Sequence, residues 1–359
     1  MLSFLIATGF ISAGLVTFLK LKKKRNIINI RSFFDTYAEI DVALPGVKCE
    51  AGQFMAMNFF INGKKVSRAY SLSNDQVGDG YGRFIVKRVV GGTVSNFLLD
   101  NAKNIKHIDI SGPYGDFILN KDSTRHIFIA GGSGITPIAS ILNTYLKKRK
   151  NDSFFLIYGN RNSQETILDD ELFSLSKVYD NLKILSFSSD GSFKSLPSVQ
   201  GVLNQEIISN CIENFHHDKD TSFYVCGPQI VIDNCKKVFE SLDIDESNIK
   251  IEKFVSLKNI EKENKNTKIV NLTIFQENKE LSIDCLKNSV VLNSCLKNNI
   301  EISYSCLSGI CKMCKVSAEG NFKEKFPLLE TDENGKKQIL SCSTYIIEDS
   351  KIIIKKQKP

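Results

Sequence analysis

The chain has 359 residues, of which 42% are hydrophobic, and this is enough for two or three domains that each bury their own core. Its ten cysteines do not indicate a secreted scaffold held by disulfides, because such scaffolds are far shorter and this chain is rich in lysine. The net charge of +7 comes from two short basic segments, residues 20–25 and 351–358, so it does not indicate nucleic-acid binding.

Residues 2–19 form an uncharged and mostly apolar run at the amino terminus. As a helix, this run spans about 27 Å, just short of a hydrocarbon core of about 30 Å, and the lysines that follow can make up the difference. A signal peptide carries its positive charge before the apolar run, whereas here the charge follows it. We therefore expect residues 1–25 to be a single-pass membrane anchor with a basic flank, which places the rest of the chain in the cytoplasm. A cleaved signal peptide and a helix that docks on a partner are the alternatives.

Residues 26–122 are predicted to form an antiparallel β-barrel or sandwich. Short runs of alternating apolar residues, at 28–30, 54–60, 84–90 and 108–110, are separated by glycine and polar turns. Three other stretches of this segment carry residues suited to binding a ligand, and they lie at residues 68–73, 91–98 and 111–117.

The stretch Arg-Ala-Tyr-Ser at residues 68–71 combines groups that bind a phosphate and a ring. An arginine offers a planar fork to a phosphate, and a tyrosine two residues later offers a flat face. The stretch Gly-Gly-Thr-Val-Ser at residues 91–95 is typical of a loop that enters a helix, where free amide groups suit a pyrophosphate. Taken one at a time, these features also fit an exposed arginine, a packed tyrosine and an ordinary loop.

Residues 123–255 are predicted to form a parallel α/β domain, because strands alternate with helical patterns. Three predicted strands end in turns at residues 131–137, 158–162 and 226–228, and open α/β sheets bind ligands at such ends. In the first turn, Thr136 is expected to cap a helix and Pro137 to occupy its first turn. Pro137 also replaces the third glycine of the dinucleotide fingerprint, so a plain α/β domain is the alternative.

Together, these motifs and their order resemble the ferredoxin–NADP reductase superfamily, whose flavin domain carries Arg-x-Tyr-Ser followed by Gly-x-x-Ser. The resemblance implies FAD rather than FMN, with Tyr70 stacked on the isoalloxazine ring and Ser71 in contact with its reactive nitrogen. It implies that the phosphates are bound by an arginine, a serine and the loop that enters the helix, namely Arg68, Gly92, Thr93, Val94 and Ser95. One departure is Ala51, where relatives often have proline.

The same resemblance assigns the second domain to NADPH or NADH. It implies that residues of the first turn hold the pyrophosphate, namely Gly132, Gly134 and Thr136. Cys226 and Gly227 then lie near the nicotinamide, and Phe254 either covers the flavin ring or belongs to the core. Arg161 either pairs with the adenosine 2′-phosphate, which favours NADPH, or is a solvated loop charge. The candidate catalytic residues are accordingly Tyr70, Ser71, Cys226 and Phe254.

Residues 256–268 are rich in lysine, asparagine and glutamate and are predicted to form a flexible linker. In residues 269–359 the pattern is strand, strand, helix at 290–296, a cysteine-rich loop and further strands. This pattern matches a small β-grasp ferredoxin domain.

Cys306, Cys311 and Cys314 are separated by four and then two residues, and Cys342 follows after 27 more. This is the plant-type ferredoxin spacing for the ligands of a 2Fe-2S cluster. Structural zinc and disulfides are the alternatives. Zinc fits poorly because its sites usually pair two short knuckles, whereas here the first gap has four residues and the fourth cysteine is distant. Gly309 suits a loop whose backbone amides crowd the sulfur atoms. The chain departs from the resemblance at Lys312, where relatives commonly have glycine.

The order of anchor, flavin domain, nucleotide domain and ferredoxin domain resembles the reductase components of bacterial oxygenases, hydroxylases and desaturases. NAD(P)H gives up two electrons as hydride and the cluster accepts one at a time, so a flavin has to lie between them. We expect single electrons to pass to a protein acceptor of one of these kinds at the membrane. The alternatives are a membrane quinone reductase, resembling the flavin subunit of sodium-pumping complexes, and a tethered ferredoxin carrier that does not oxidise nucleotide. In the sodium-pumping complexes the ferredoxin module precedes the flavin domain, whereas here it follows.

Overall fold

A computed structural model describes residues 23–33, 35–75, 80–161, 166–191, 193–254, 268–276 and 279–354. The apolar run predicted as a membrane anchor and residues 255–267 of the linker region lie outside these ranges. Within the described ranges, no helix is long and apolar enough to span a membrane.

The first domain, in its described part, is an antiparallel sheet with the strand order β4-β3-β6-β1-β2-β5. Leu72, next to the end of β4, forms a bridge with Phe84 in β5, which brings the two outer strands together and closes the sheet into a barrel. Alternate residues such as Ile40, Val42 and Met57 fill its interior. The elements are β1 (Lys23–Phe33), β2 (Tyr37–Ala43), β3 (Phe54–Ile61), β4 (Lys64–Ser71), β5 (Tyr81–Lys87), α1 (Thr93–Asp100) and β6 (His107–Tyr114).

Strand β1 begins inside the segment that was predicted to be the basic flank of the anchor. Lys23, Lys24 and Arg25 pair with residues of β6. The sequence pattern did not indicate this strand start because consecutive basic residues are untypical of a strand.

The second domain is a parallel sheet whose described strands have the order β10-β9-β8-β7-β11-β12. Helices α2 and α3 cover one face of this sheet and share a core with the barrel of the first domain, named here the flavin barrel after its predicted cofactor. Helices α4 and α5 cover the other face of the sheet and form a second core. The strands are β7 (Arg125–Gly131), β8 (Ser153–Asn160), β9 (Leu182–Ser188), β10 (Ser198–Gln200), β11 (Thr221–Gly227) and β12 (Ile249–Lys253). The helices are the short η1 (Gly132–Gly134), α2 (Ile135–Tyr145), α3 (Asp169–Val178), α4 (Gln205–Asn214), α5 (Gln229–Ser241) and the short η3 (Glu246–Asn248).

Helix α2 begins earlier than it would if Thr136 were its N-cap. Gly134 is its N-cap, and Thr136 is the second helical residue, whose Oγ1 donates a hydrogen bond to the carbonyl of Ser133. The prediction that Thr136 caps the helix is therefore wrong, whereas Pro137 does lie in the first turn.

The third domain has the predicted β-grasp order, with α6 packed across a mixed sheet of order β14-β13-β19-β15-β17 in the described residues. The cysteine-rich loop lies between α6 and β15, and Cys342 lies between β17 and β18. The elements are β13 (Ile269–Gln276), β14 (Lys279–Leu286), α6 (Val291–Lys297), β15 (Lys315–Glu319), β16 (Phe322–Glu324), β17 (Gln338–Leu340), β18 (Thr344–Ile346) and β19 (Ser350–Ile354).

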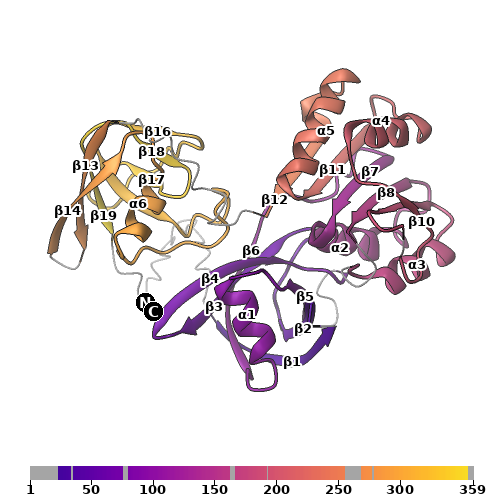
Figure 1. The fold of residues 1–359 in the computed structure, drawn as a ribbon, viewed down its shortest axis with the longest axis horizontal. Coiled ribbons are helices and arrows are strands. Elements are labelled where there is room, and N and C mark those ends of the chain that lie inside the picture. Colours follow the sequence, from indigo (N-terminus) through magenta and orange to yellow (C-terminus); the bar gives the residue numbers. More distant parts are fainter. Residues whose placement is uncertain are drawn as a thin grey trace, which may run out of the picture.

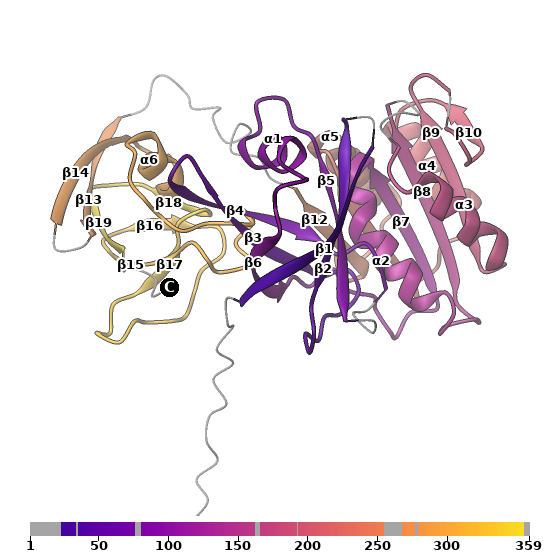
Figure 2. The ribbon, with the colours of Figure 1, turned by 90° about the horizontal axis from the view of Figure 1, so that it is seen from below.

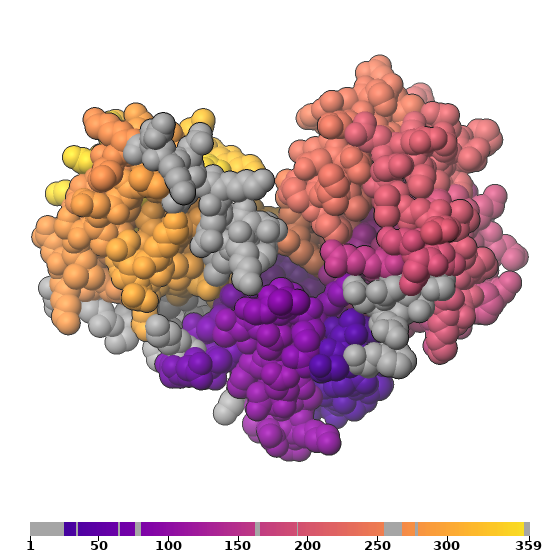
Figure 3. Space-filling view, viewed as in Figure 1, coloured from indigo at the N-terminus to yellow at the C-terminus, as the bar shows by residue number. Residues whose placement is uncertain are grey.

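The flavin barrel lies between the other two domains (Figures 1 and 2). The nucleotide domain shares an apolar core with the barrel, because Tyr37, Ile85 and Phe117 of the barrel pack with residues of α2. In the space-filling view the nucleotide and ferredoxin domains form separate lobes above the barrel (Figure 3).

Candidate active site

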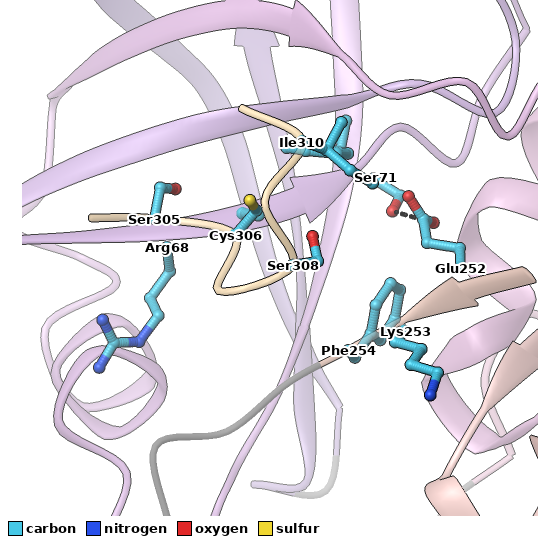
Figure 4. Close-up of a pocket in the computed structure, with 11 residues that line it drawn as sticks. Arg68, Ser71, Glu252, Lys253, Phe254, Ser305, Cys306, Ser308 and Ile310 are labelled. Carbon is cyan, nitrogen blue, oxygen red and sulfur yellow. Dashed lines mark hydrogen bonds between the residues drawn. The ribbon is translucent and has the colours of Figure 1, made fainter. Parts of the chain in front are cut away.

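A pocket lies where the three domains meet (Figure 4). The barrel contributes residues of β3 and β4, the nucleotide domain contributes the end of β12, and the ferredoxin domain contributes its cysteine loop. The lining residues are Phe54, Arg68, Ala69, Ser71, Glu252, Lys253, Phe254, Ser305, Cys306, Ser308 and Ile310. Three predicted site residues, Arg68, Ser71 and Phe254, thus line the same pocket as Cys306, a predicted cluster ligand.

Ser71 and Glu252 join the flavin and nucleotide domains at this pocket. Ser71 Oγ donates a hydrogen bond of 3.2 Å to Glu252 Oε2, and both side chains are buried. Figure 4 shows the two groups pointing toward each other. Burial raises the pKa of Glu252 to about 8, and the nearby Asp116 and Cys306 act in the same direction. A carboxyl group with this pKa is largely protonated at neutral pH and can donate as well as accept a proton.

Glu252 was not among the residues predicted for the site. The family resemblance pointed instead to Phe254, two residues further along, as a residue that covers the flavin ring. A single glutamate in a strand is commonplace, and only the packing of β12 against the barrel buries this one.

Tyr70 and Arg68 occupy β4, on the side of the barrel that faces the ferredoxin domain. Tyr70 packs against the barrel core, and burial raises the pKa of its phenol. Arg68 Nη1 donates to the carbonyl of Ser67 at 2.7 Å and to the hydroxyl of Tyr304 at 3.5 Å. Its guanidinium carbon also lies 5.5 Å from the centroid of the Tyr304 ring. The predicted phosphate ligand therefore also contacts the ferredoxin domain.

The loop predicted to bind pyrophosphate does enter a helix, because α1 begins at Thr93 with Gly92 as its N-cap. Val94 is buried in the barrel core, so only its backbone is available to a ligand. Ser95 is also buried, and its Oγ accepts a hydrogen bond of 3.1 Å from the backbone amide of Val89. This hydrogen bond closes the loop, and the backbone amides of the first turn of α1 lie at the edge of the loop.

The glycine turn after β7 packs directly on the end of β11. A Cβ atom at Gly134 would lie 2.0 Å from the carbonyl oxygen of Cys226, and one at Gly227 would lie 2.9 Å from the amide nitrogen of Gly131. Gly132 has a φ of +55°, and the nearest atom to a Cβ there is Asn160 Oδ1 at 3.7 Å. The predicted nucleotide residues of both turns are thus brought together at the carboxyl edge of the sheet, where a pyrophosphate can approach the backbone.

Cys226 lies below this edge. Its thiol is fully buried, and burial raises its pKa well above the usual value, with a further contribution from Glu252 on the neighbouring strand. Phe254 is half exposed at the pocket mouth, and Arg161 is exposed at the end of β8. The carbonyl of Arg161 accepts a hydrogen bond from Ser188 Oγ, which ties the ends of β8 and β9 together.

The four cysteines of the predicted cluster are buried and form two close pairs. Cys314 Sγ and Cys342 Sγ are 3.1 Å apart, and a hydrogen bond between Cys306 and Cys311 lowers the pKa of Cys306 and raises that of Cys311. In the described residues, no three His, Cys, Asp or Glu side chains converge on a single metal-ion position. A 2Fe-2S cluster has two irons that each take two thiolates, so two pairs of cysteines fit it and a single zinc site does not.

Backbone amides surround the sulfur atoms. The amide of Cys311 lies 3.4 Å from Cys306 Sγ, and the amides of Ser308, Gly309 and Met313 donate to Cys306, Cys342 and Cys311 respectively. Such donors stabilise thiolate ligands and tune a cluster. These contacts show that the residues present fit the predicted cluster.

The loop is held by residues in the left-handed region. Leu307, Gly309 and Lys312 have φ values of 57°, 81° and 55°. A Cβ atom at Gly309 would lie 2.7 Å from the ring of Phe326, so glycine is needed there. Lys312 adopts the backbone conformation that glycine favours, and its Nζ forms an ion pair with Glu330 at 2.7 Å. Although lysine replaces the glycine that is common in related sequences, the backbone at this position has the conformation that glycine favours.

The cysteine loop packs on the flavin barrel. Cys306, Cys311 and Met313 form an apolar cluster with Phe54 and Tyr114 of the barrel. Burial, with smaller contributions from the two thiols, raises the pKa of Tyr114. The predicted cluster ligands therefore pack directly on the barrel, and Cys306 lines the same pocket as Arg68 and Ser71.

Comparison with known protein families gives three matches that together cover most of the chain. The family described as oxidoreductase FAD-binding domain matches residues 35–118, and the oxidoreductase NAD-binding domain matches residues 128–237. The 2Fe-2S iron-sulfur cluster binding domain matches residues 274–346.

Similar proteins include a component of the 1,2-phenylacetyl-CoA epoxidase of Escherichia coli (strain K12), which is 25% identical over 308 residues, or 81% of this chain and 84% of that one. A flavohemoprotein of Bacillus cereus is 30% identical over 215 residues, which are 56% of this chain and 52% of the relative. The chain therefore spans about half the length of that relative. The solved structure of phthalate dioxygenase reductase has a TM-score of 0.60 at 21% identity, covering 93% of this chain and 98% of that one, and it shows the same fold.

Proposed function

Since this chain belongs to the ferredoxin–NADP reductase superfamily and carries a carboxy-terminal 2Fe-2S domain, we propose that it passes electrons from NAD(P)H through FAD and the cluster to a protein acceptor. It is an oxidoreductase with FAD-binding, NAD-binding and 2Fe-2S domains. The acceptor in this proposal is a terminal oxygenase, hydroxylase or desaturase. The names of the epoxidase component and the phthalate dioxygenase reductase support this class of acceptor.

The observation that carries the proposal is the pocket shared by all three domains. Ser71 of the flavin domain, Glu252 of the nucleotide domain and Cys306 of the ferredoxin domain line it together. A donor, a flavin and a cluster have to be close for electrons to pass among them, and this pocket supplies residues for each. When bound, the flavin converts hydride transfer into single-electron transfer, and the cluster accepts those electrons one at a time.

The chain's own residues bind and orient the reactants around this pocket. The glycine turns at residues 131–134 and 226–228 present backbone amides to the nucleotide pyrophosphate, and Arg68 presents its guanidinium to the phosphates of FAD. Glu252, whose pKa is raised, would hold a proton on its carboxyl group beside Ser71 Oγ, the group predicted to contact the reactive nitrogen of the flavin. Phe54, Phe254 and the cysteine loop exclude water from the pocket.

Removing one cluster ligand tests the proposal. In Cys342→Ala, we expect loss of iron and of NAD(P)H-driven cytochrome c reduction, because electrons have to leave through the cluster. Reduction of ferricyanide, a small acceptor that takes electrons from flavin directly, should stay within about twofold of wild type. Cytochrome c reduction that survives the loss of iron would contradict the proposed route.

The apolar run of residues 2–19 supports a further part of the proposal, that the acceptor lies at a membrane and the three domains face the cytoplasm. Deletion of residues 1–22, which ends before β1, tests this part. We expect the shortened protein to move from the membrane fraction to the supernatant with its ferricyanide activity intact. Retention in the membrane fraction would overturn it.

A further inference from the structure

The cluster is closed to an acceptor on the side that faces the flavin barrel. Cys306 and Cys311 are 8% and 6% exposed and pack against Phe54 and Tyr114. A protein acceptor cannot reach this side while the two domains are packed together. Electrons that enter from the flavin side therefore need another face of the ferredoxin domain to leave by.

Phe326 lies between the two segments that carry the predicted cluster ligands. Its ring approaches Gly309 of the cysteine loop closely, since a Cβ atom there would be 2.7 Å away. The backbone amide of its neighbour Lys325 donates a hydrogen bond of 3.0 Å to the carbonyl of Ser343, next to Cys342. Phe326 is nevertheless 44% exposed, and Leu329 is fully exposed. An exposed aromatic ring thus lies against the cysteine loop, three residues before the exposed Leu329.

Two lysines beside this surface differ from their neighbours in lacking a carboxylate partner within the described ranges. Four other lysines of the same region each have a glutamate partner: Lys312 and Lys315 pair with Glu330, Lys336 with Glu319, and Lys337 with Glu324. Lys323 and Lys325, on either side of Glu324, have no carboxylate partner among the residues that the structure describes. Lys325 Nζ lies 5.3 Å from the centroid of the Phe326 ring, so charge and apolar surface adjoin.

The positive field extends to the nucleotide domain. Lys253, at the end of β12, has its pKa lowered by burial and by the neighbouring charges of Lys236 and Lys325. Lys236 and Lys253 of the nucleotide domain and Lys325 of the ferredoxin domain thus lie near one another, with Asp233 as a smaller opposing charge. Such a field attracts an acidic partner and repels a basic one.

We propose that Lys323, Lys325, Phe326 and Leu329, named here the exit patch, are the docking surface for the electron acceptor, a protein with an apolar surface fringed by carboxylates. This inference rests on the proposed function. An anionic membrane surface would also favour lysine beside exposed aromatic and aliphatic residues. A protein acceptor is favoured because Phe326 of the patch packs against the cysteine loop, where electrons have to leave at short range.

The test compares patch variants with a matched control. Lys323→Glu with Lys325→Glu reverses the charge of the patch, and Leu329→Ser removes its most exposed apolar side chain. Phe326 is left unchanged because its ring supports Gly309. Lys279→Glu with Lys287→Glu makes the same change of charge at exposed positions in and next to β14 of the same domain. Cytochrome b5, an acidic haem protein, and cytochrome c, a basic one, serve as acceptors with either nucleotide.

At low ionic strength, charge reversal at the patch should slow cytochrome b5 reduction by about tenfold and accelerate cytochrome c reduction, with both effects lost at high salt. Leu329→Ser should slow cytochrome b5 reduction by about threefold at any ionic strength. The control pair should stay within about twofold of wild type for both acceptors. Equal effects of the patch and control pairs on cytochrome b5 would overturn the proposal.

Two parallel measurements distinguish a failure of this inference from a failure of the proposed function and from binding to a lipid surface. Spectroscopic reduction of the cluster by NAD(P)H is followed in each preparation, and its absence from wild type would overturn the proposed function together with this inference. Sedimentation with vesicles of phosphatidylserine and phosphatidylcholine tests the lipid alternative. Vesicle binding that is lost on charge reversal, with cytochrome b5 reduction unchanged, would assign the patch to a membrane and overturn the acceptor proposal.

Discussion

Glu252 holds a carboxyl group away from water at the junction of the flavin and nucleotide domains. It is 6% exposed, and Ser71 Oγ is its hydrogen-bond partner across the junction. Burial favours the neutral form and raises its pKa to about 8. In this state Glu252 can retain a proton at neutral pH beside the position predicted for the flavin ring.

The raised pKa predicts a dependence of stability on pH. Between the usual value of 4.5 and the folded value of about 8, the folded state binds one more proton at Glu252 than the unfolded state. The free energy of unfolding therefore falls as pH rises through this interval. Glu252→Gln removes the titrating group, so its urea-unfolding free energy should fall less between pH 5 and pH 8 than that of wild type. Equal falls in the two proteins would contradict the assignment.

Lys312 adopts a backbone conformation that suits glycine better than lysine, because its φ is 55°. Lys312→Gly and Lys312→Ala both lose the ion pair with Glu330, so comparing them isolates the backbone term. We expect the glycine variant to be more stable than the alanine variant by about 1 kcal/mol. Both should keep their iron, since the lysine side chain does not contact the sulfur atoms. An alanine variant as stable as the glycine variant in urea unfolding would contradict the strained backbone.

At the scale of elements, the two glycine turns fix the distance between β7 and β11. Gly134 has an ordinary helical φ, so alanine there is disfavoured only by the carbonyl oxygen of Cys226, 2.0 Å from the new Cβ. Gly134→Ala should raise the KM for nucleotide at least about tenfold by displacing the turn, with FAD and iron content unchanged. Gly201→Ala is the control, because its Cβ would meet only side-chain atoms, the end of the flexible Ile207 at 3.0 Å and Phe187 at an ordinary contact distance of 3.6 Å. Equal KM values in the two variants would contradict a role for this contact.

The sequence predicted the elements whose chemistry is local. Three of these elements each depend on a few consecutive residues: the cysteine loop, the glycine turn after β7 and the helix that begins at Thr93. The structure contains all three. Thr136 was wrong as a cap because the short helix Gly132–Gly134 runs directly into α2, which leaves Thr136 inside the helix. Glu252 and the Arg68–Tyr304 contact were missed because tertiary packing alone creates them, across 181 and 236 positions of sequence.

At the scale of the whole molecule, a polar contact fixes the nucleotide domain on the barrel. Arg83 in β5 forms a double contact with Glu171 in α3, at 2.7 and 2.8 Å, and Asn143 in α2 donates to the same carboxylate. These groups lie beside the shared apolar core, so polar and apolar contacts act at one interface. The orientation of the two domains then sets how the nucleotide meets the flavin.

Breaking this contact on one side should destabilise the protein. Arg83→Met leaves the Glu171 carboxylate without its charged partner, although Asn143 still donates to it, and should lower the free energy of unfolding by about 2 kcal/mol. Adding Glu171→Leu removes the unpaired charge and should recover at least about half of that loss. Urea unfolding of the single and double variants measures both values. Additive losses in the double variant would show that the two side chains do not act as a pair.

The ferredoxin domain contacts the barrel through a separate set of residues. Tyr304 contacts Arg68, and Met313, Cys306 and Cys311 pack against the barrel. Three of these residues, Arg68, Cys306 and Cys311, are also predicted to bind cofactors. The proposed route from nucleotide to flavin to cluster would therefore follow the interfaces between the three domains.

The most direct test of this route is an anaerobic titration of the full chain, loaded with FAD and with iron and sulfide, with NADPH and with NADH. Absorbance follows the flavin, and electron paramagnetic resonance follows the cluster. We predict that one of the nucleotides bleaches the flavin and produces the signal of a reduced 2Fe-2S cluster in the same sample. A flavin that is fully bleached beside a cluster that stays fully oxidised would contradict it.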